Sequence, residues 1–324
     1  MSDGDSCSCS YSYFDGDEAD AEQIKELWLT IDTEFDPVLS GVNIIMAKHE
    51  DELVGVLHFA LHELLIDGRP VVGARLYGDV IKQKYDEAGV MEHLIDEAVK
   101  CAGEKGAELI FCTPANEEYF YNRGFDDIYE NVELDFDISV LEDDSTVPSD
   151  LSGEEGYYHV RLRDMSDEEL EALAAKVNEE LGAKYTAFVK RDRAYLESVR
   201  DKHISRNGGV MAVYESGMRE DEEETERLAA VFTYDILGDT LYVERYESFD
   251  ANIRYSLDSI VKLTESVLCS RCVINMPSLE LNDDVYNLLG IWARVNDGKL
   301  VMAKSLNSSI SVEELKKKSF FDEM

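Results

Sequence analysis

Residues 86–91, of sequence DEAGVM, lie between a predicted strand and a predicted helix, a junction that can bind an anion. The first N–H groups of a helix have no partner inside it, and they form the positive end of the helix dipole. A loop that leads into a helix therefore points donors at whatever lies above it, and a diphosphate is the usual occupant. The chemistry expected here is the binding of a phosphorylated ligand.

The elements that position this loop follow from the spacing of apolar residues. Residues 71–82 are rich in apolar and β-branched side chains and predict a strand. Residues 89–105 have apolar residues at three- and four-residue spacing, which predicts a helix, and Gly106 ends it. The apolar residues are Val90, Leu94, Ala98 and Cys101. Residues 109–113 predict a short buried strand, so the three elements form a crossover unit with two neighbouring strands.

This order resembles the GNAT superfamily of acetyl-CoA-dependent N-acetyltransferases, because Pro114-Ala115-Asn116 follows the second strand and YNRGF stands at 121–125. It is most similar to bacterial members with R-G-x-G-[IL]-M before the helix and P-A-N after the next strand. The resemblance covers residues 20–140, and beyond residue 155 it rests on element order alone. It implies an α/β fold of mixed α+β type with two tandem GNAT-like domains. Each would be a mostly antiparallel sheet with a parallel crossover pair and flanking helices.

The loop departs from the family pattern at its first positions. Gly89 and Met91 match, but Asp86 and Glu87 stand where the family has Arg and Gly. Two like charges about 4 Å apart repel by roughly 1 kcal/mol in water and by about 4 kcal/mol at an effective dielectric near 20. These acids would weaken the binding of a diphosphate, and lysines just upstream at 82 and 84 could offset part of the loss. The alternative is structural, because acids commonly stabilise the positive end of a helix.

The resemblance also implies the cofactor contacts, with acetyl-CoA as co-substrate. The strands at 76–82 and 109–113 would separate to admit the pantetheine arm. Backbone groups of Ile81 and Lys82 would line the arm, and Asn116 could hydrogen-bond it. The residues whose N–H groups would face the diphosphate are Ala88, Gly89, Val90 and Met91.

Three residues are candidates for acid–base chemistry, although alignment of the reactants alone can supply much of the rate. GNAT enzymes often place a tyrosine a few residues before the terminal Gly-Phe, which implies Tyr121 as the acid for the leaving thiolate. The commonest family spacing falls on Phe120, so Tyr119 is a rival. The alternative is that these aromatic residues only pack a short helix. Asp79, in the strand beside the cleft, could take the proton of the amine directly or through water, or could be a solvent-exposed strand-end carboxylate.

Histidine and cysteine spacing predicts no metal site. His58 and His62 are four apart, but the surrounding VGVLHFALHELLI alternates like a strand, where such residues are too far apart to bind one ion. The C-x-x-C at 269–272 has no second pair, and the CSC at 7–9 has the wrong spacing for zinc. Cysteines of a chain with no targeting signal are expected to be reduced thiols.

The net charge of the chain limits which classes of partner are expected. The 324 residues carry a formal net charge of −39 at pH 7. Phosphate binding depends on clustered Lys and Arg, so neither nucleic acid nor an anionic membrane is expected as partner. The charge favours a cationic acceptor, such as an amine-bearing small molecule or a peptide, through long-range attraction. The alternative is that the acids only keep the protein soluble or reflect a salt-tolerant proteome.

Composition indicates a cytoplasmic globular protein. Its apolar fraction of 44% suits a folded chain, and no apolar run reaches the length of a membrane span. The N-terminal sequence MSDGDSCSCSYSYFDGDEAD has acids and serines where a signal peptide needs a basic and then an apolar stretch.

The chain is long enough for two domains, and composition places their boundaries. The predicted parts are a flexible acidic tail at 1–18, a cofactor-binding domain at 19–140, an acidic linker at 141–156, a second domain at 157–310 and a C-terminal tail at 311–324. In the second half, Ser166 and Glu169 form a capping box at the start of a predicted helix. Strands at 290–295 and 300–305 are predicted with a turn at 296–298 between them.

The second half is expected to lack a cofactor loop. Residues 247–251, ahead of the predicted helix at 253–268, contain no glycine, so the backbone there cannot approach a phosphate closely. A GNAT-like second half would therefore be degenerate and would wall the substrate cleft. Together with the acidic loop at 86–87, this leaves an alternative function, a non-catalytic binding or scaffolding protein that has lost the cofactor.

Overall fold

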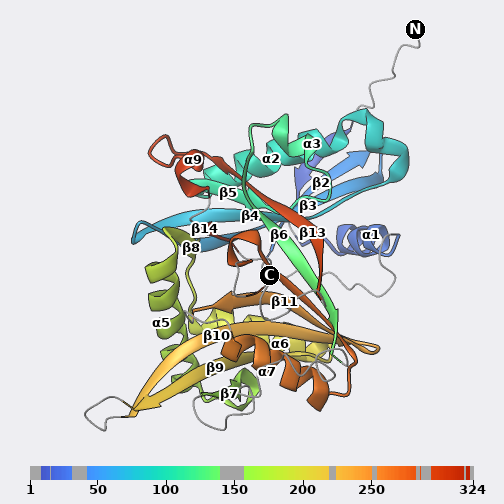
Figure 1. Ribbon diagram of the computed structural model, residues 1–324. Coiled ribbons are helices and arrows are strands. Elements are labelled where there is room, and N and C mark those ends of the chain that lie inside the picture. The colour runs from blue at the N-terminus through green and yellow to red at the C-terminus, as the bar shows by residue number, and fades with distance from the viewer. Residues whose placement is uncertain are drawn as a thin grey trace. The chain divides into compact units, whose positions relative to one another are not determined.

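The structure is a computed structural model with mixed α/β architecture (Figure 1). It describes residues 9–14, 16–30, 42–138, 157–218, 224–249, 254–281, 285, 293–316 and 319–321. Contacts divide the chain into two compact units. Unit 1 comprises Met1–Ile128 and Leu300–Lys316, and unit 2 comprises Tyr129–Lys299 and Lys317–Met324. The predicted fold class is confirmed, because each unit has a mostly antiparallel sheet with one parallel crossover pair.

The sheet of unit 1 has the strand order β1-β2-β3-β4-β5-β13. The strands are β1 (Ser10–Tyr13), β2 (Asn43–His49), β3 (Glu52–Ile66), β4 (Arg69–Ile81), β5 (Leu109–Cys112) and β13 (Arg294–Ser305), the last entering unit 1 at Leu300. Neighbours run antiparallel except β4 and β5, which are parallel. Helix α2 (Val90–Glu104) joins these two strands and completes the predicted crossover unit.

Helix α1 (Glu18–Trp28) and helix α2 cover opposite faces of the unit 1 sheet. Successive side chains of a strand point to opposite faces, so neighbouring strand residues pack against different helices. The cluster around α2 includes Ile45, Leu57 and Phe59, and the cluster around α1 includes Ile44, Met46 and Val56. The short helices of this unit are η1 (Gln83–Ala88), α3 (Glu118–Tyr121) and α9 (Val312–Leu315).

The sheet of unit 2 has the order β6-β12-β11-β10-β9-β7. Its strands are β6 (Asp126–Asp137), β7 (Tyr157–Arg161), β9 (Gly209–Met218), β10 (Glu224–Leu237), β11 (Thr240–Ser248) and β12 (Arg271–Pro277). The parallel pair is β11 and β12, which helix α7 (Arg254–Ser266) joins. Unit 2 thus contains the same strand–helix–strand order as unit 1.

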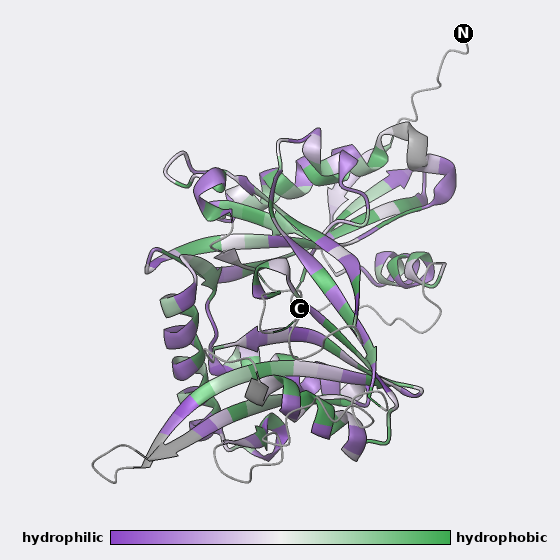
Figure 2. Cartoon of the chain, in the orientation of Figure 1, coloured by the Kyte–Doolittle hydropathy of each residue, from purple (hydrophilic) through white to green (hydrophobic). Residues whose placement is uncertain are grey.

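Helices α5 (Asp167–Lys184) and α6 (Arg193–Ser205) pack against each other and against strands of unit 2. The capping box of α5 is present, since Glu169 N donates to Ser166 Oγ at 3.3 Å and Ser166 N donates to the Glu169 carboxylate at 2.7 Å. Figure 2 shows the hydrophilic and hydrophobic sides of α5. The remaining elements of unit 2 are β8 (Ala187–Val189), β14 (Ser319–Phe320), η3 (Leu162–Asp164) and η4 (Ser278–Glu280).

No helix in the described part of the chain is long and apolar enough to cross a membrane.

The predicted N-terminal tail is wrong in its second half. Strand β1 pairs with β2 from Ser10 opposite Lys48 to Tyr13 opposite Ile45, because the outer edge of β2 offers free backbone donors and acceptors. Helix α1 starts at Glu18 because the Asp17 carboxylate caps it, accepting from Ala19 N at 2.9 Å. Residues 1–8 lie outside the described chain.

The predicted turn at 296–298 is also wrong, because β13 runs through it without interruption. Gly298 serves a close approach of two strands instead of a turn. A Cβ atom at this position would lie 2.4 Å from the Asn131 carbonyl oxygen of β6. Residues 290–292 of the predicted preceding strand lie outside the described chain.

The compact units differ from the predicted domains at the C-terminus. Residues 302–305 pair with β5, so this part of the predicted second domain completes the sheet of unit 1. The predicted tail beyond 310 contributes β14, which pairs in parallel with β8. In unit 2 the Tyr129 hydroxyl donates to Phe321 O at 2.6 Å and accepts from Phe321 N at 3.0 Å. The predicted linker at 141–156 lies outside the described residues.

Replacing Gly298 with alanine tests whether this position lies in a tightly paired strand. We expect Gly298→Ala to lower the free energy of unfolding by about 1–3 kcal/mol, because the added methyl group must displace the backbone of Asn131. The exposed neighbour Asp297 provides the control, and Asp297→Ala should change stability by less than about 0.5 kcal/mol. Urea unfolding of both variants gives the comparison, and equal stability would favour a turn.

Candidate active site

The loop between β4 and α2 ends in a glycine that leaves the start of the helix open. Gly89 has φ +73°, a left-handed conformation that favours glycine, and it is the N-cap of α2. It offers no side-chain cap, so no N-cap side chain accepts from the first-turn N–H groups. The predicted donors Val90 and Met91 lie in this turn, and their side chains are buried. This arrangement can bind an anion at the positive end of a 15-residue helix.

Ala88, the fourth predicted donor, is the last residue of η1. The side chains of residues 86–88, which include the two acids of the loop, lie outside the described chain.

The parallel pair β4–β5 opens beside this helix start. Pairing runs from Gly73 opposite Leu109 to Leu76 opposite Cys112, where β5 ends. Strand β4 continues to Ile81, still paired with β3 on its other side. The ladder between β4 and β5 thus ends at Leu76, as expected for strands that separate. Ile81 and the following Lys82 lie beyond this point, where the sequence predicted contacts to an extended ligand.

A β-bulge interrupts β4 on the opened stretch. The register with β3 shifts between the pairs Val56–Val80 and His58–Tyr77, and Gly78 has φ +63°. Bulges are frequent next to active sites, where they redirect side chains. Asp79, the predicted base, is half-buried in this bulge. Burial raises the pKa of the Cys112 thiol well above its usual value, and the charge of Asp79 adds to the rise.

The lysines upstream of the loop bind another carboxylate. Lys82 Nζ and Lys84 Nζ lie 2.8 Å and 2.9 Å from the two carboxylate oxygens of Glu52. Their hydrogen bonds lower the pKa of Glu52 to about 2, so it stays ionised at neutral pH. Part of the positive charge that these lysines could offer to a diphosphate is therefore already neutralised.

A third carboxylate lies at the start of α2. Glu92 Oε2 is buried, lies 3.9 Å from the position that a Cβ atom of Gly89 would occupy, and has no hydrogen-bond partner within the described chain. His93 Nδ1 donates to Gly89 O at 2.7 Å, and Tyr11 of β1 stacks on the His93 ring at 5.3 Å. Glu92 was not among the acids predicted to oppose a diphosphate, although the sequence places it in the first turn of the predicted helix.

The side-chain oxygen of Asn116 is used within its own segment. Asn116 is exposed, and its Oδ1 accepts from Glu118 N at 3.1 Å at the beginning of α3. The contact of Asn116 with a pantetheine arm stays a prediction. With Oδ1 already accepting from Glu118 N, we expect the Asn116 amide nitrogen to donate to the arm.

The two candidate tyrosines have different surroundings. Tyr121 is 45% exposed, and its hydroxyl donates to Asp127 Oδ1 at 2.5 Å. This hydrogen bond raises the pKa of Tyr121 to about 12, which makes it a weaker acid than an ordinary tyrosine. Tyr119 is half-buried against the core around α2. Phe120 between them is buried edge-to-face with Phe125 at 5.2 Å, so packing explains this member of the aromatic group.

A histidine lies beside the bulge on the α1 face of the sheet. His58 is 3% exposed, and its Nδ1 is 3.0 Å from Gly78 O. Its ring lies 5.6 Å from the Tyr77 ring and 5.9 Å from the Trp28 ring. The sequence predicted only that His58 and His62 do not bind one metal ion. Nothing in the sequence marks the β3–β4 register that places His58 opposite the bulge.

The described part of unit 2 contains one carboxylate–histidine group with the spacing of a metal site, formed by His203, Asp235 and Glu244. His203 Nδ1 lies 2.8 Å from Asp235, while Arg206 lies 3.3 Å and Lys202 3.5 Å from the Glu244 carboxylate. These cations already balance the carboxylates. The expectation of no metal stays a prediction.

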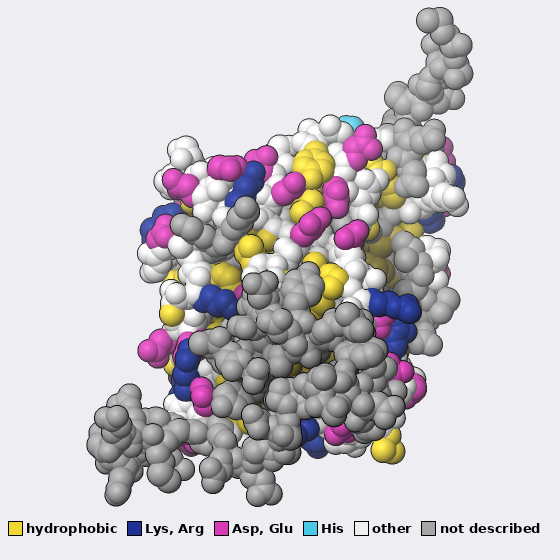
Figure 3. Space-filling model, in the orientation of Figure 1, with side chains coloured by type: hydrophobic (Ala, Val, Ile, Leu, Met, Phe, Trp, Pro, Cys, Tyr) yellow, Lys and Arg dark blue, Asp and Glu magenta, His cyan; other side chains and the backbone are white. Residues whose placement is uncertain are grey.

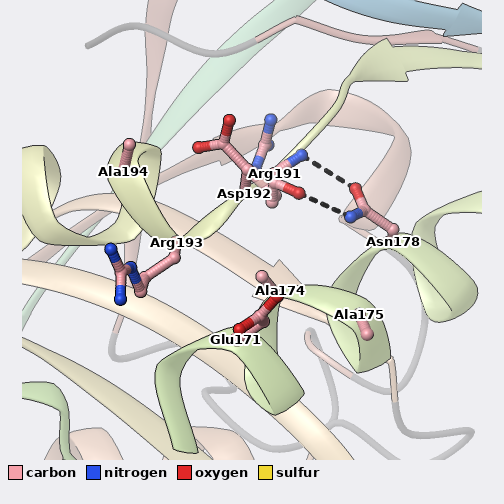
Figure 4. A pocket seen from close by; sticks show the side chains of 8 residues that line it. All are labelled: Glu171, Ala174, Ala175, Asn178, Arg191, Asp192, Arg193 and Ala194. Carbon is pink, nitrogen blue, oxygen red and sulfur yellow. Dashed lines mark hydrogen bonds between the residues drawn. The ribbon is translucent and has the colours of Figure 1, made fainter. Parts of the chain in front are cut away.

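A cavity of about 540 Å³ also lies in unit 2, between α5 and the beginning of α6. In Figure 4, the Asn178 side chain binds both backbone groups of Arg191, accepting from its N at 2.8 Å and donating to its O at 2.6 Å. On the face shown in Figure 3, lysine and arginine side chains occur in separate groups among acidic ones.

The Tyr121–Asp127 hydrogen bond can be tested by titration. We expect Asp127→Asn to lower the pKa of Tyr121 from about 12 toward the ordinary value of 10.0, because the variant removes the acceptor and its charge. Asp126, the exposed neighbour, contributes only through its charge, so Asp126→Asn should change the pKa much less. NMR titration of tyrosine labelled at Cζ measures both. Equal shifts in the two variants would contradict this assignment.

Comparisons with known proteins agree with this geometry. Residues 10–128 match the family model of the acetyltransferase (GNAT) domain. This match covers β1 to the start of β6 and includes the opened β4–β5 pair and α2. No match is found among curated protein sequences.

Solved structures show the same fold over most of the chain. A GCN5-related N-acetyltransferase from Kribbella flavida has a TM-score of 0.59 at 14% identity, covering 93% of this chain and 72% of its own. A probable N-acyltransferase from Enterococcus faecalis V583 gives 0.67 at 12% identity, with coverages of 92% and 73%. A GCN5-related N-acetyltransferase from Anabaena variabilis gives 0.63 at 10% identity, also with 92% and 73%. Residues 10–128 are therefore similar to the acetyltransferase (GNAT) domain, and the solved structures show that the chain has the same fold.

Proposed function

We propose that this protein transfers an acetyl group from acetyl-CoA to a primary amine of a small molecule or peptide. The observation that carries the proposal is the uncapped start of α2 beside the opened end of the β4–β5 pair. A diphosphate at the helix start and an extended arm along the free edge of β4 require these two features together. The family supports an acyltransferase in general, and the acetyl donor and the amine are our inference.

In this reaction the amine nitrogen attacks the thioester carbonyl carbon. The C–S bond breaks, the amine loses a proton to a base, and the leaving thiolate gains one from an acid. The N–H groups of Gly89, Val90 and Met91 would hold the diphosphate, and the β4 edge at Ile81 and Lys82 would hold the arm. Most of the rate would come from alignment of the two reactants.

The candidate base lies on β4, and the two candidate acids lie in α3, the helix that follows β5 in the sequence. Asp79, the base predicted from the sequence, lies in the bulge of β4. Tyr121 and Tyr119 compete for the role of acid, and the high pKa of Tyr121 favours Tyr119. The net charge of −39 favours a cationic acceptor.

The alternative is a non-catalytic GNAT-fold protein that binds or scaffolds another molecule. Two observations favour it: Glu92 lies beside the helix start, and Glu52 neutralises part of the charge of Lys82 and Lys84. Each lowers the affinity expected for a diphosphate.

Binding of acetyl-CoA distinguishes the two functions. Acetyl-CoA at about 100 times its Kd should stabilise the protein by roughly 2.7 kcal/mol in thermal unfolding. Glu92→Gln should tighten binding, because it removes a negative charge from the first turn of α2; a like charge about 4 Å from the diphosphate would repel it by roughly 1 kcal/mol in water, which corresponds to about fivefold in Kd.

Glu97→Gln provides the control, because it removes the same charge from a position further along α2, where Kd should change little. Binding by Glu92→Gln without binding by the parent would support the non-catalytic function. No binding by either protein at millimolar acetyl-CoA would contradict the acetyltransferase proposal.

Removal of each tyrosine hydroxyl identifies the acid. If Tyr119 protonates the thiolate, Tyr119→Phe should lower kcat by roughly 10²–10⁴ with little change in the Kd for acetyl-CoA. Tyr121→Phe should then keep most of its turnover, because its proton is held by Asp127. The reverse pattern would assign the role to Tyr121, and full activity in both would mean that water protonates the thiolate. The rate of CoA release, measured with a thiol reagent for the parent and both variants, distinguishes the three outcomes.

A further inference from the structure

The hydrogen bond of His58 fixes which ring nitrogen carries the proton. Gly78 O, 3.0 Å from Nδ1, can only accept, so in the neutral ring Nδ1 is the donor and Nε2 has the lone pair. Nε2 is buried and has no hydrogen-bond partner within the described chain. A buried acceptor left unpaired costs about 1–3 kcal/mol, so such a group commonly has a catalytic role or a bound water.

The surroundings keep this ring neutral. Burial lowers the pKa of His58 below its usual 6.5, and the hydrogen bond to Gly78 opposes this only in part. The side chains that face it are Trp28 from α1, Ile44 from β2 and Tyr77 from β4. Tyr77 is titratable, and burial raises its pKa, so it is uncharged at neutral pH. Two charged residues of β4 are near in the strand: the guanidinium of Arg75 lies 5.5 Å from the centre of the Tyr77 ring, and Asp79 directly follows Gly78.

His58 is also tied to the bulge that lies on the opened stretch of β4. A Cβ atom on Gly78 would lie 2.7 Å from His58 Nδ1 and 3.0 Å from the Trp28 ring, so only glycine permits this contact. The imidazole therefore packs over β4 on the α1 face of the sheet, at the level where the pairing of β4 with β5 has ended. A base need not touch the proton that it takes, because one water can bridge the two groups.

We propose that His58 is the general base of this site and takes the proton of the acceptor amine through one water bound at Nε2. The amine N–H bond breaks as its nitrogen bonds to the acetyl carbon, the water passes the proton to Nε2, and the proton later leaves to solvent. This inference rests on the proposed acetyltransferase function. It gives the base role to a residue on β3 in place of Asp79.

His58→Asn tests the role, because the asparagine amide can still donate to Gly78 O but has no base at the position of Nε2. With acetyl-CoA and spermidine as a cationic probe amine, we expect kcat/KM to fall by about 10²–10⁴ while the Kd for acetyl-CoA stays within about twofold. In the parent, kcat/KM should decline as the pH drops through a pKa below 6.5, and this decline should be absent in the variant.

His62→Asn is the matched control on the same strand, and its rate and pH profile should equal those of the parent. An unchanged rate and pH profile in His58→Asn, with binding of acetyl-CoA intact, would overturn the role of His58 and leave the proposed function standing. No binding of acetyl-CoA by the parent would contradict both the role of His58 and the proposed acetyltransferase function.

If His58→Asn does not fold, ¹⁵N NMR of the labelled parent decides. A proton on Nε2 in the neutral ring would overturn the inference, and the Nδ1-protonated form with a pKa below 6.5 would support it.

Discussion

The end of β-pairing between β4 and β5 is the constraint on which the candidate site depends. Parallel strands need a crossover connection, and here the crossover is α2, which follows β4 after the short helix η1. Because β5 stops at Cys112 while β4 continues to Ile81, β4 runs on past the end of its ladder with β5, and the helix start has no side-chain cap. The glycine at position 89 makes the sharp entry into the helix and leaves its first donors uncovered.

Charge acts against this site as well as for it. An anion is attracted by the helix start and by Lys82 and Lys84, but these two lysines share the carboxylate of Glu52. Glu92 places a further negative charge within the first turn. A diphosphate would therefore bind through backbone hydrogen bonds more than through side-chain charge.

Unit 2 repeats the strand–helix–strand order of unit 1, but its sequence differs ahead of the helix. Its parallel pair β11–β12 is joined by α7, as β4–β5 is joined by α2. Residues 247–251 contain no glycine where unit 1 has Gly89, so the backbone conformation that exposes the helix start has no equivalent residue in the sequence. Buried charges of unit 2 pair with each other, as Arg191 does with Glu247 at 2.9 Å.

Local sequence determined the order of the elements and the place of the loop, because apolar spacing, the capping box at Ser166 and Gly106 each act within a few residues. Only the tertiary structure decided what happens between segments distant in the chain. Asn296-Asp297-Gly298 has the composition of a turn, yet Gly298 lies in a strand that runs close to β6. A Cβ atom built on Gly298 would lie 2.4 Å from the Asn131 carbonyl oxygen of β6. Tyr121 has the position of an acid, but Asp127 holds its proton. His58 lies opposite the bulge only because the β3–β4 register shifts there, and register depends on the pairing of whole strands.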